Sequence, residues 1–297
     1  MKKKIVAFRG CGTALVTPFT ESGPDLPALE GLIDWQIESG IDALIACGTT
    51  GEPSTMSEEE RDGVIACAVK RAGGRVPVIA GVGGNDTRAV TAAAVRAEAL
   101  GADAVLAVTP YYNKTTQAGL VAHFTALADA SNLPVILYNV PARTGLNMTP
   151  ETLSVLADHP RIAAVKEASG DIKQITEIFR LCGERLAVYS GNDDHIVPFL
   201  SLGGEGVISV VSNICPRETR ELVASYGAGD ADRARALQFK LNPLTDALFC
   251  EVSPIPVKTA LNLMGMRAGS LRLPLVPMSA DNERRLKTEM RKAGLIE

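Results

Sequence analysis

Short apolar runs, each followed by a stretch with helical features, recur along this chain and constrain its fold more than any other feature. The runs are continuously apolar rather than alternating, as expected for parallel strands that are buried on both faces. From the second run onward their starts lie 33, 28, 30, 28, 24 and 20 residues apart. The eight runs cover residues 12–19, 43–50, 76–83, 104–110, 134–140, 162–169, 186–192 and 206–212.

The segments between the runs carry signals for the starts and ends of helices. Ser57 and Glu60 have the spacing of a capping box. Thr149 is followed by proline and glutamate, which is typical of an N-cap with proline in the first helical turn. Gly183 is placed to end a helix that we expect over 171–182. The chain is therefore predicted to alternate strands with helices.

Such an alternation can close into a (β/α)8 barrel or remain an open, doubly wound sheet. The dinucleotide-binding form of the open sheet needs a G-x-G-x-x-G turn after its first strand, and the sequence has neither this motif nor a Walker A motif. Eight units within roughly 225 residues match the usual size of the closed barrel. We therefore predict an α/β fold with a (β/α)8 TIM barrel over residues 1–225.

Beyond about Ser225 the strand-like runs stop and only helical patterns follow. We predict a C-terminal helical extension over residues 226–297. No linker rich in glycine and serine separates it from the rest of the chain, so we expect it to pack on the barrel.

Composition and charge exclude several classes of function. Of 297 residues, 46% are apolar and 22% are charged, close to globular averages, which excludes intrinsic disorder. Thirty basic and 34 acidic residues give a net charge of −4, so we expect no nucleic-acid partner. No apolar run reaches the ~18 residues of a membrane span, so we expect no membrane partner either.

The cysteines and histidines bear on compartment and metal binding. The six cysteines are scattered without a C-x-x-C pair, so we expect reduced, mostly buried thiols and a cytoplasmic protein. Arg9 and Gly10 interrupt the apolar start of the chain, which argues against a signal peptide. The histidines follow one another at intervals of 36 residues, far from the spacing of zinc ligands, so we expect no metal.

Active sites of (β/α)8 barrels lie at the C-terminal ends of the strands. Polar side chains that the sequence places there belong to the second, fourth, fifth, sixth and seventh runs. They are Thr49 and Thr50, Tyr111 and Tyr112, Tyr138 and Arg143, Lys166 and Glu167, and Ser190, Gly191 and Asn192.

Lys166 is the most informative of these residues, because it interrupts an apolar stretch in a strand that should be buried. Burial lowers the pKa of a lysine, and a neutral amine can attack a carbonyl to form a Schiff base. The alternative is a lysine at the barrel rim, paired with a carboxylate such as Glu167. Tyr138 ends the adjacent strand, and its phenol could transfer protons during imine formation. It could equally be a packed tyrosine with its hydroxyl bonded to a carbonyl.

The remaining strand-end residues each have two interpretations. The hydroxyls of Thr49 and Thr50 could relay a proton or bind a carboxylate, although a Gly-Thr-Thr-Gly stretch is more often only a turn. The planar fork of Arg143 suits a substrate carboxylate, although most arginines are exposed surface residues. Tyr111 and Tyr112 precede a polar stretch, which suggests an exposed loop or a subunit contact.

The strand-end residues belong to six longer motifs, which are GTTGE (48–52), VTPYYNK (108–114), YNVPARTG (138–145), VKEASGD (165–171), SGND (190–193) and GVISV (206–210). The helical extension adds SPIPVK (253–258) and LRLP (271–274). Taken together, these motifs resemble the dihydrodipicolinate synthase/N-acetylneuraminate lyase superfamily, and its dihydrodipicolinate synthase branch above all. The likeness covers essentially the whole chain, and the six motifs occur in the right order.

The resemblance implies catalytic roles for individual residues. Lys166 matches the Schiff-base lysine, which forms an imine with C2 of pyruvate. Tyr138 matches the tyrosine that donates and accepts protons. Thr49 and Tyr112 match the other two members of a proton relay, and Tyr111 is expected to cross into the site of a neighbouring subunit.

The resemblance also implies substrate-binding residues and a reaction. Thr50, Ile208 and Gly191 match positions of the pyruvate pocket, and Arg143 matches the arginine that holds the carboxylate of L-aspartate 4-semialdehyde. The implied reaction condenses the two substrates to 4-hydroxy-tetrahydrodipicolinate in lysine (diaminopimelate) biosynthesis, without a metal or organic cofactor. The implied assembly is a homo-oligomer, a tetramer built as a dimer of dimers.

Two alternatives stay open. One is a pyruvate-dependent lyase or aldolase of sugar acids, such as N-acetylneuraminate or a 2-keto-3-deoxy sugar acid. Lyases of this group usually lack an arginine after the YN-P motif, so Arg143 favours the synthase. The other is a non-catalytic sensor of keto acids, because a fold alone never determines function.

One departure from the resemblance concerns feedback inhibition. Members of the family that lysine inhibits carry histidines just after GTTGE and a glutamate shortly after the asparagine matched by Asn85. This chain has Glu58, Arg61 and Ala89 at those positions. We therefore predict weak or absent inhibition by lysine.

Overall fold

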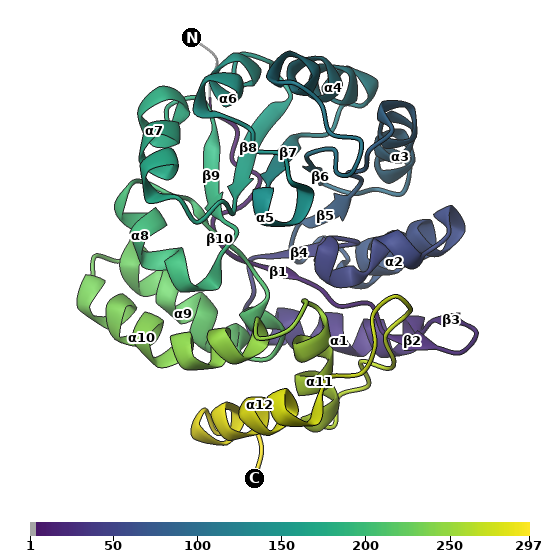
Figure 1. Cartoon of the computed structure of the whole chain (residues 1–297), viewed down its shortest axis with the longest axis vertical. Helices are drawn as coiled ribbons and strands as arrows, with labels where there is room; N and C mark the ends of the chain where they lie inside the picture. The colour runs from purple at the N-terminus through teal and green to yellow at the C-terminus, as the bar shows by residue number, and fades with distance from the viewer. Residues whose placement is uncertain (1–3) are drawn as a thin grey trace.

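A computed structural model describes residues 4–297, and its centre is a closed barrel of eight parallel strands (Figure 1). Around the barrel the order is β1-β10-β9-β8-β7-β6-β5-β4. The predicted (β/α)8 barrel is thereby confirmed. The strands are β1 (Gly10–Ala14), β4 (Ala43–Ala46), β5 (Val78–Gly81), β6 (Ala104–Val108), β7 (Val135–Asn139), β8 (Ile162–Glu167), β9 (Ala187–Ser190) and β10 (Gly206–Ser209).

Helices follow the strands and surround the barrel, as Figure 1 shows. Short helical turns follow several strands on the way to these helices. The helices are α1 (Leu26–Glu38), α2 (Glu58–Ala72), α3 (Thr87–Ala99), α4 (Gln117–Ala130), α5 (Pro141–Thr144), α6 (Pro150–Leu156), α7 (Ile172–Cys182), α8 (Ile196–Ser201) and α9 (Pro216–Gly227). The turns are η1 (Thr49–Gly51), η2 (Pro53–Thr55), η3 (Asp193–His195) and η4 (Val211–Asn213).

The first predicted strand is too long at its C-terminal end. It was expected to reach Phe19, whereas β1 ends at Ala14 and Phe19 lies in a small antiparallel hairpin of β2 (Phe19–Thr20) and β3 (Gly23–Pro24). The ring of Phe19 leaves the barrel because it packs beneath two cations, with Lys258 Nζ 4.6 Å and Arg272 Cζ 4.2 Å from its centre. A contact distant in sequence thus decides where the strand ends.

The predicted helix boundaries are confirmed, one of them for a different reason. Ser57 accepts a hydrogen bond from the Glu60 amide, and the Glu60 carboxylate accepts one from the Ser57 amide at 3.0 Å. Thr149 caps α6. Gly183 caps α7 without adopting the left-handed conformation, since its φ is −57°. A Cβ there would lie 2.6 Å from the Phe179 carbonyl oxygen, so this close approach is what requires glycine.

The buried apolar residues form two clusters. One cluster lies inside the barrel and includes Ile45, Ile79, Ile136 and Ile208, and a larger one includes side chains of the barrel strands and of the surrounding helices. Every residue of β4, β7, β8, β9 and β10 is buried, as the continuous apolar runs predicted. All six cysteines are free thiols and five of them are buried.

The C-terminal extension consists of α10 (Ala231–Leu248), α11 (Ile255–Leu263) and α12 (Ala280–Lys292), in the lower part of Figure 1. Helix α10 packs against α8 and α9, and α12 packs against α10 and α11. The division into domains at residue 225 stays a prediction, and α9 itself continues to Gly227. Within residues 4–297, no helix has the length and apolar character that a bilayer crossing requires.

Candidate active site

The candidate site is centred on Lys166 and Tyr138, which neighbouring strands bring side by side. The two residues are register partners on β8 and β7. The Lys166 ammonium nitrogen lies 4.4 Å from the centre of the Tyr138 ring, and the two residues are only 5% and 7% exposed. The expectation that Tyr138 reaches the Lys166 amine is thus met by the geometry of the sheet.

Glu167 does not pair with Lys166. Successive side chains of a strand point to opposite faces, so the two residues face opposite sides of β8. The Glu167 carboxylate accepts hydrogen bonds from the Asn139 amide group at 2.9 Å and from the Ser169 backbone at 2.7 Å. The structure therefore removes the alternative in which Lys166 is only one half of an ion pair with Glu167.

Burial lowers the pKa of Lys166 from 10.5 to about 8. The charge of Asp193 opposes this shift, and the positive charge of Arg143 adds to it. A substantial fraction of the amine is then neutral at mildly alkaline pH, with its lone pair available to a carbonyl carbon.

The Tyr138 phenol has its own set of influences. Burial raises its pKa, whereas the positive charge of Arg143 and a hydrogen bond with Thr49 lower it. Thr49 begins η1, the turn that follows β4. The two hydroxyls are therefore linked, as a proton relay through Tyr138 and Thr49 requires.

Asp193 is a buried carboxylate beside Lys166 for which sequence analysis proposed no role. It is 3% exposed and accepts hydrogen bonds from Ser209 Oγ at 2.5 Å and from the amides of Val210 at 2.9 Å and Val211 at 3.2 Å. Burial raises its pKa, and these donors and Lys166 lower it. The available signal was a carboxylate within SGND, directly after the seventh strand, where a negative charge could face the lysine.

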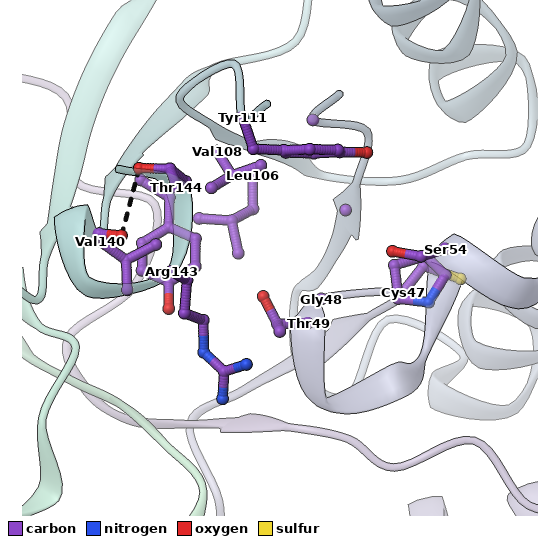
Figure 2. Close-up of a pocket in the computed structure, with 14 residues that line it drawn as sticks. Cys47, Gly48, Thr49, Ser54, Leu106, Val108, Tyr111, Val140, Arg143 and Thr144 are labelled. Carbon is purple, nitrogen blue, oxygen red and sulfur yellow. Dashed lines mark hydrogen bonds between the residues drawn. The ribbon is translucent and has the colours of Figure 1, made fainter. Parts of the chain in front are cut away.

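Six of the residues singled out by the sequence surround one deep cavity of about 40 Å³. Two wider cavities of about 210 and 300 Å³ adjoin it, and Tyr138 and Arg143 line all three. Figure 2 shows the side chains of Arg143 and Thr49 extending into the 210 Å³ cavity. The six residues at the deep cavity are Lys166, Tyr138, Thr49, Thr50, Arg143 and Gly191.

Gly191 gives Lys166 the space that it occupies. A Cβ on Gly191 would lie 2.6 Å from the Ala168 Cβ, 3.1 Å from the Glu167 carbonyl oxygen and 3.2 Å from the Lys166 Cε. Its amide also donates to the Glu167 carbonyl at 2.8 Å. The position tolerates no side chain without displacing the lysine or the strand beside it.

Arg143 reaches the site from α5, the short helix after β7. The residue is exposed, and its Nη2 donates to the Ser253 carbonyl in the C-terminal extension at 3.3 Å. Most of its five donors thus remain for a ligand, and the guanidinium fork suits a carboxylate.

The other predicted residues, Tyr111, Tyr112 and Ile208, do not line the deep cavity. Tyr111 lines the 210 Å³ cavity of its own chain (Figure 2), whereas Tyr112 is 91% exposed with a φ of 67°. A single chain does not bring Tyr112 to Thr49, so its place in the relay stays a prediction. Ile208 is buried inside the barrel, and Val210 of the same segment lines the deep cavity.

The sequence profile of the family described as "Dihydrodipicolinate synthetase family" matches residues 7–293. The chain belongs to the dihydrodipicolinate synthetase family. Among its relatives is a protein of Thermoanaerobacter sp. (strain X514) named 4-hydroxy-tetrahydrodipicolinate synthase. It is 53% identical over 97% of this chain and 98% of the relative.

Solved structures of the family share the fold. The crystal structure of dihydrodipicolinate synthase from Thermotoga maritima is 45% identical, with a TM-score of 0.96 and coverage of 98% of this chain and 100% of the other. That of the Acinetobacter baumannii enzyme in complex with pyruvate is 43% identical, with a TM-score of 0.95 and coverage of 97% and 99%. The family resemblance drawn from six motifs is confirmed over nearly the full chain.

Proposed function

We propose that this chain condenses pyruvate with L-aspartate 4-semialdehyde to 4-hydroxy-tetrahydrodipicolinate, a step of lysine (diaminopimelate) biosynthesis. The observation that carries the proposal is a buried lysine beside a buried tyrosine, in a cavity that they share with Arg143. The name of the Thermoanaerobacter relative supports the same reaction. The pyruvate in the Acinetobacter baumannii structure supports the first substrate.

The first half of the reaction uses Lys166. Its neutral amine attacks C2 of pyruvate, and loss of one water molecule leaves an imine. Loss of a proton from C3 turns the imine into an enamine. Tyr138 and Thr49 accept and return these protons, because their linked hydroxyls lie beside the lysine.

The second half joins the two substrates. The enamine carbon attacks the aldehyde carbon of the semialdehyde, whose carboxylate Arg143 holds. The amine of the semialdehyde then attacks the imine carbon, which closes the ring and returns the lysine as a free amine. The net change is one carbon–carbon bond, one carbon–nitrogen double bond and one released water, with no metal, redox partner or organic cofactor.

We further propose that the active form is a homotetramer, a dimer of dimers, in the cytoplasm. Tyr112 would complete the relay in the assembled protein, and its 91% exposure in the single chain leaves it free to contact another copy. The free cysteines support a reducing compartment.

The test is pyruvate-dependent turnover of L-aspartate 4-semialdehyde, coupled to the following reductase and measured as NADPH loss. Cleavage of N-acetylneuraminate and of 2-keto-3-deoxy sugar acids is measured beside it. We expect turnover of the semialdehyde that is lost in Lys166→Ala. Cleavage of a sugar acid alone would keep the Schiff base and contradict the substrate, and no activity, with no pyruvate trapped by borohydride, would contradict the whole proposal.

A further inference from the structure

Two motifs of the C-terminal extension have no part in the reaction above, yet both contact the segment 49–60, which begins with Thr49. SPIPVK (253–258) supplies Lys258, and LRLP (271–274) supplies Arg272. Both side chains extend to the segment 49–60 after β4. The extension is therefore joined to one particular part of the barrel's active-site face.

Lys258 forms a fully buried ion pair with Glu52. The distance from its Nζ to Glu52 Oε1 is 2.8 Å, and the side chains are 1% and 2% exposed. The same Nζ donates to the carbonyls of Thr17 at 3.0 Å and Ser270 at 2.5 Å. All three ammonium hydrogens are thus used, which fixes the orientation of the ammonium group relative to Glu52.

Glu52 is the residue that joins η1 to η2, and its backbone is strained. Its φ of 56° and ψ of 41° lie in the left-handed region that non-glycine residues rarely occupy. Its second carboxylate oxygen accepts from the Arg272 amide at 3.2 Å. One residue earlier, Thr17 Oγ1 donates to the Gly51 carbonyl at 2.7 Å. Bonds from two distant segments therefore hold the end of the Thr49–Gly51 turn.

Arg272 binds the later part of the segment 49–60, at Thr55 and Glu60. Its guanidinium donates to the Thr55 carbonyl at 2.8 Å and to both carboxylate oxygens of Glu60 at 2.7 and 2.6 Å. The segment that contains Lys258 also touches Arg143, through the Ser253 carbonyl. The extension thus contacts the elements that carry both the proton relay and the carboxylate-binding arginine.

We propose that Lys258 is a positioning residue, which acts through Glu52 to hold the Thr49 hydroxyl against the Tyr138 phenol. This inference rests on the proposed function, because the relay matters only if Tyr138 transfers protons. Stability alone does not require this buried ion pair, since apolar side chains of similar volume would join the extension to the barrel equally well. Directed hydrogen bonds to a strained residue next to η1 fit a positioning role.

The test is a double-mutant cycle between Lys258→Met and Thr49→Val. Methionine keeps the apolar stem of lysine and removes the ammonium. Arg267→Met is the matched control, because Arg267 also joins the extension to the barrel, through Asp25 at 2.7 Å at the start of α1. Two rates are measured below the unfolding midpoint of each variant. They are steady-state turnover and the rate at which borohydride traps pyruvate on Lys166.

We expect Lys258→Met to lower kcat and the trapping rate about ten- to a hundredfold, as a misplaced catalytic group does, with the KM for pyruvate changed by less than about threefold. In the Thr49→Val background, Lys258→Met should lower either rate by less than about threefold, because its effect passes through Thr49. Arg267→Met should leave both rates unchanged in either background.

Full additivity of the two losses, or a Lys258→Met protein with wild-type rates, would overturn the inference. Should Lys258→Met fail to fold, Glu52→Gln replaces it in the same cycle, since the amide keeps the shape of the side chain. If the wild type traps pyruvate but does not turn over the semialdehyde, only the proposed function is contradicted. The double-mutant cycle can then still be evaluated from the trapping rates. No trapping in the wild type would contradict both.

Discussion

Lys166 and Tyr138 are register partners on adjacent parallel strands, and the ammonium nitrogen of one lies 4.4 Å from the ring centre of the other. Neighbouring strands lie about 4.8 Å apart, so two inward-facing partners on adjacent strands are held at contact distance by the backbone ladder itself. The central pair of the site therefore depends on barrel geometry and on no mobile loop.

Replacing Lys166 with methionine should stabilise the protein at neutral pH while abolishing activity. Below about pH 8 the folded and unfolded states both carry the ammonium, and the folded state bears the full cost of its burial. A shift from 10.5 to about 8 predicts a gain in the free energy of unfolding of about 3 kcal/mol at pH 7. The advantage should shrink as pH rises from about 8 to 10.5. Urea titrations of the two proteins at pH 7 and pH 10 measure the difference in the free energy of unfolding. An equal difference at the two pH values would contradict the prediction.

Formation of the pyruvate imine should accelerate with pH until the Lys166 amine is neutral. The neutral amine is the nucleophile, and its pKa is about 8, so the trapping rate should rise nearly tenfold per unit well below pH 8 and level off above it. Rapid-quench borohydride trapping at a fixed, low pyruvate concentration measures the profile. A rate still rising steeply above pH 10 would show that burial does not lower the pKa of this lysine.

Tyr138→Phe should lower kcat about a hundred- to ten-thousandfold, the usual contribution of a general acid–base group. The ring against Lys166 is kept, so the thermal midpoint should change little. Thr49→Val is the companion variant, because it removes the hydroxyl bonded to Tyr138 and leaves the phenol in place. Near-wild-type kcat in Tyr138→Phe would exclude the phenol as the proton carrier.

Gly191→Ala should lose most of its activity, because the added methyl group meets Ala168 and the Lys166 side chain at 2.6 and 3.2 Å. Gly63→Ala, within α2, is the control, since a Cβ there meets nothing within 4 Å. That control should be active and slightly more stable, by about 0.5–1 kcal/mol. Comparison of trapped pyruvate in the two variants separates displacement of Lys166 from a general loss of folding.

Lysine should inhibit this enzyme weakly or not at all. The glutamate and histidines of the lysine-inhibited relatives are replaced by Ala89, Glu58 and Arg61, although Asn85 is kept and bonds to the Tyr111 carbonyl at 3.3 Å. Steady-state turnover at increasing lysine concentration measures the effect. Inhibition at submillimolar lysine would show that the remaining residues suffice for binding.

Much of the fold and the centre of the site follow from the sequence alone. The continuous apolar runs predicted eight strands buried on both faces, because a strand with one face in solvent would alternate apolar and polar residues. The one lysine that interrupts such a run, Lys166, was expected either to be buried or to lie at the barrel rim beside Glu167, and the structure buries it. The end of the preceding strand gave Tyr138 as its neighbour. The burial pattern is predictable because the alternation of side chains between the two faces of a strand is a local property.

The tertiary structure alone decided the rest. Phe19 ends outside the barrel because it packs against Lys258 and Arg272, more than 200 residues away. Asp193 becomes the charge opposite Lys166 only when β9 and β10 close the barrel around it. The Glu52–Lys258 pair likewise joins segments 206 residues apart. Such contacts leave no periodic trace in a sequence, because each depends on how distant elements pack, and a single pairing of charges carries no pattern that a local rule can detect.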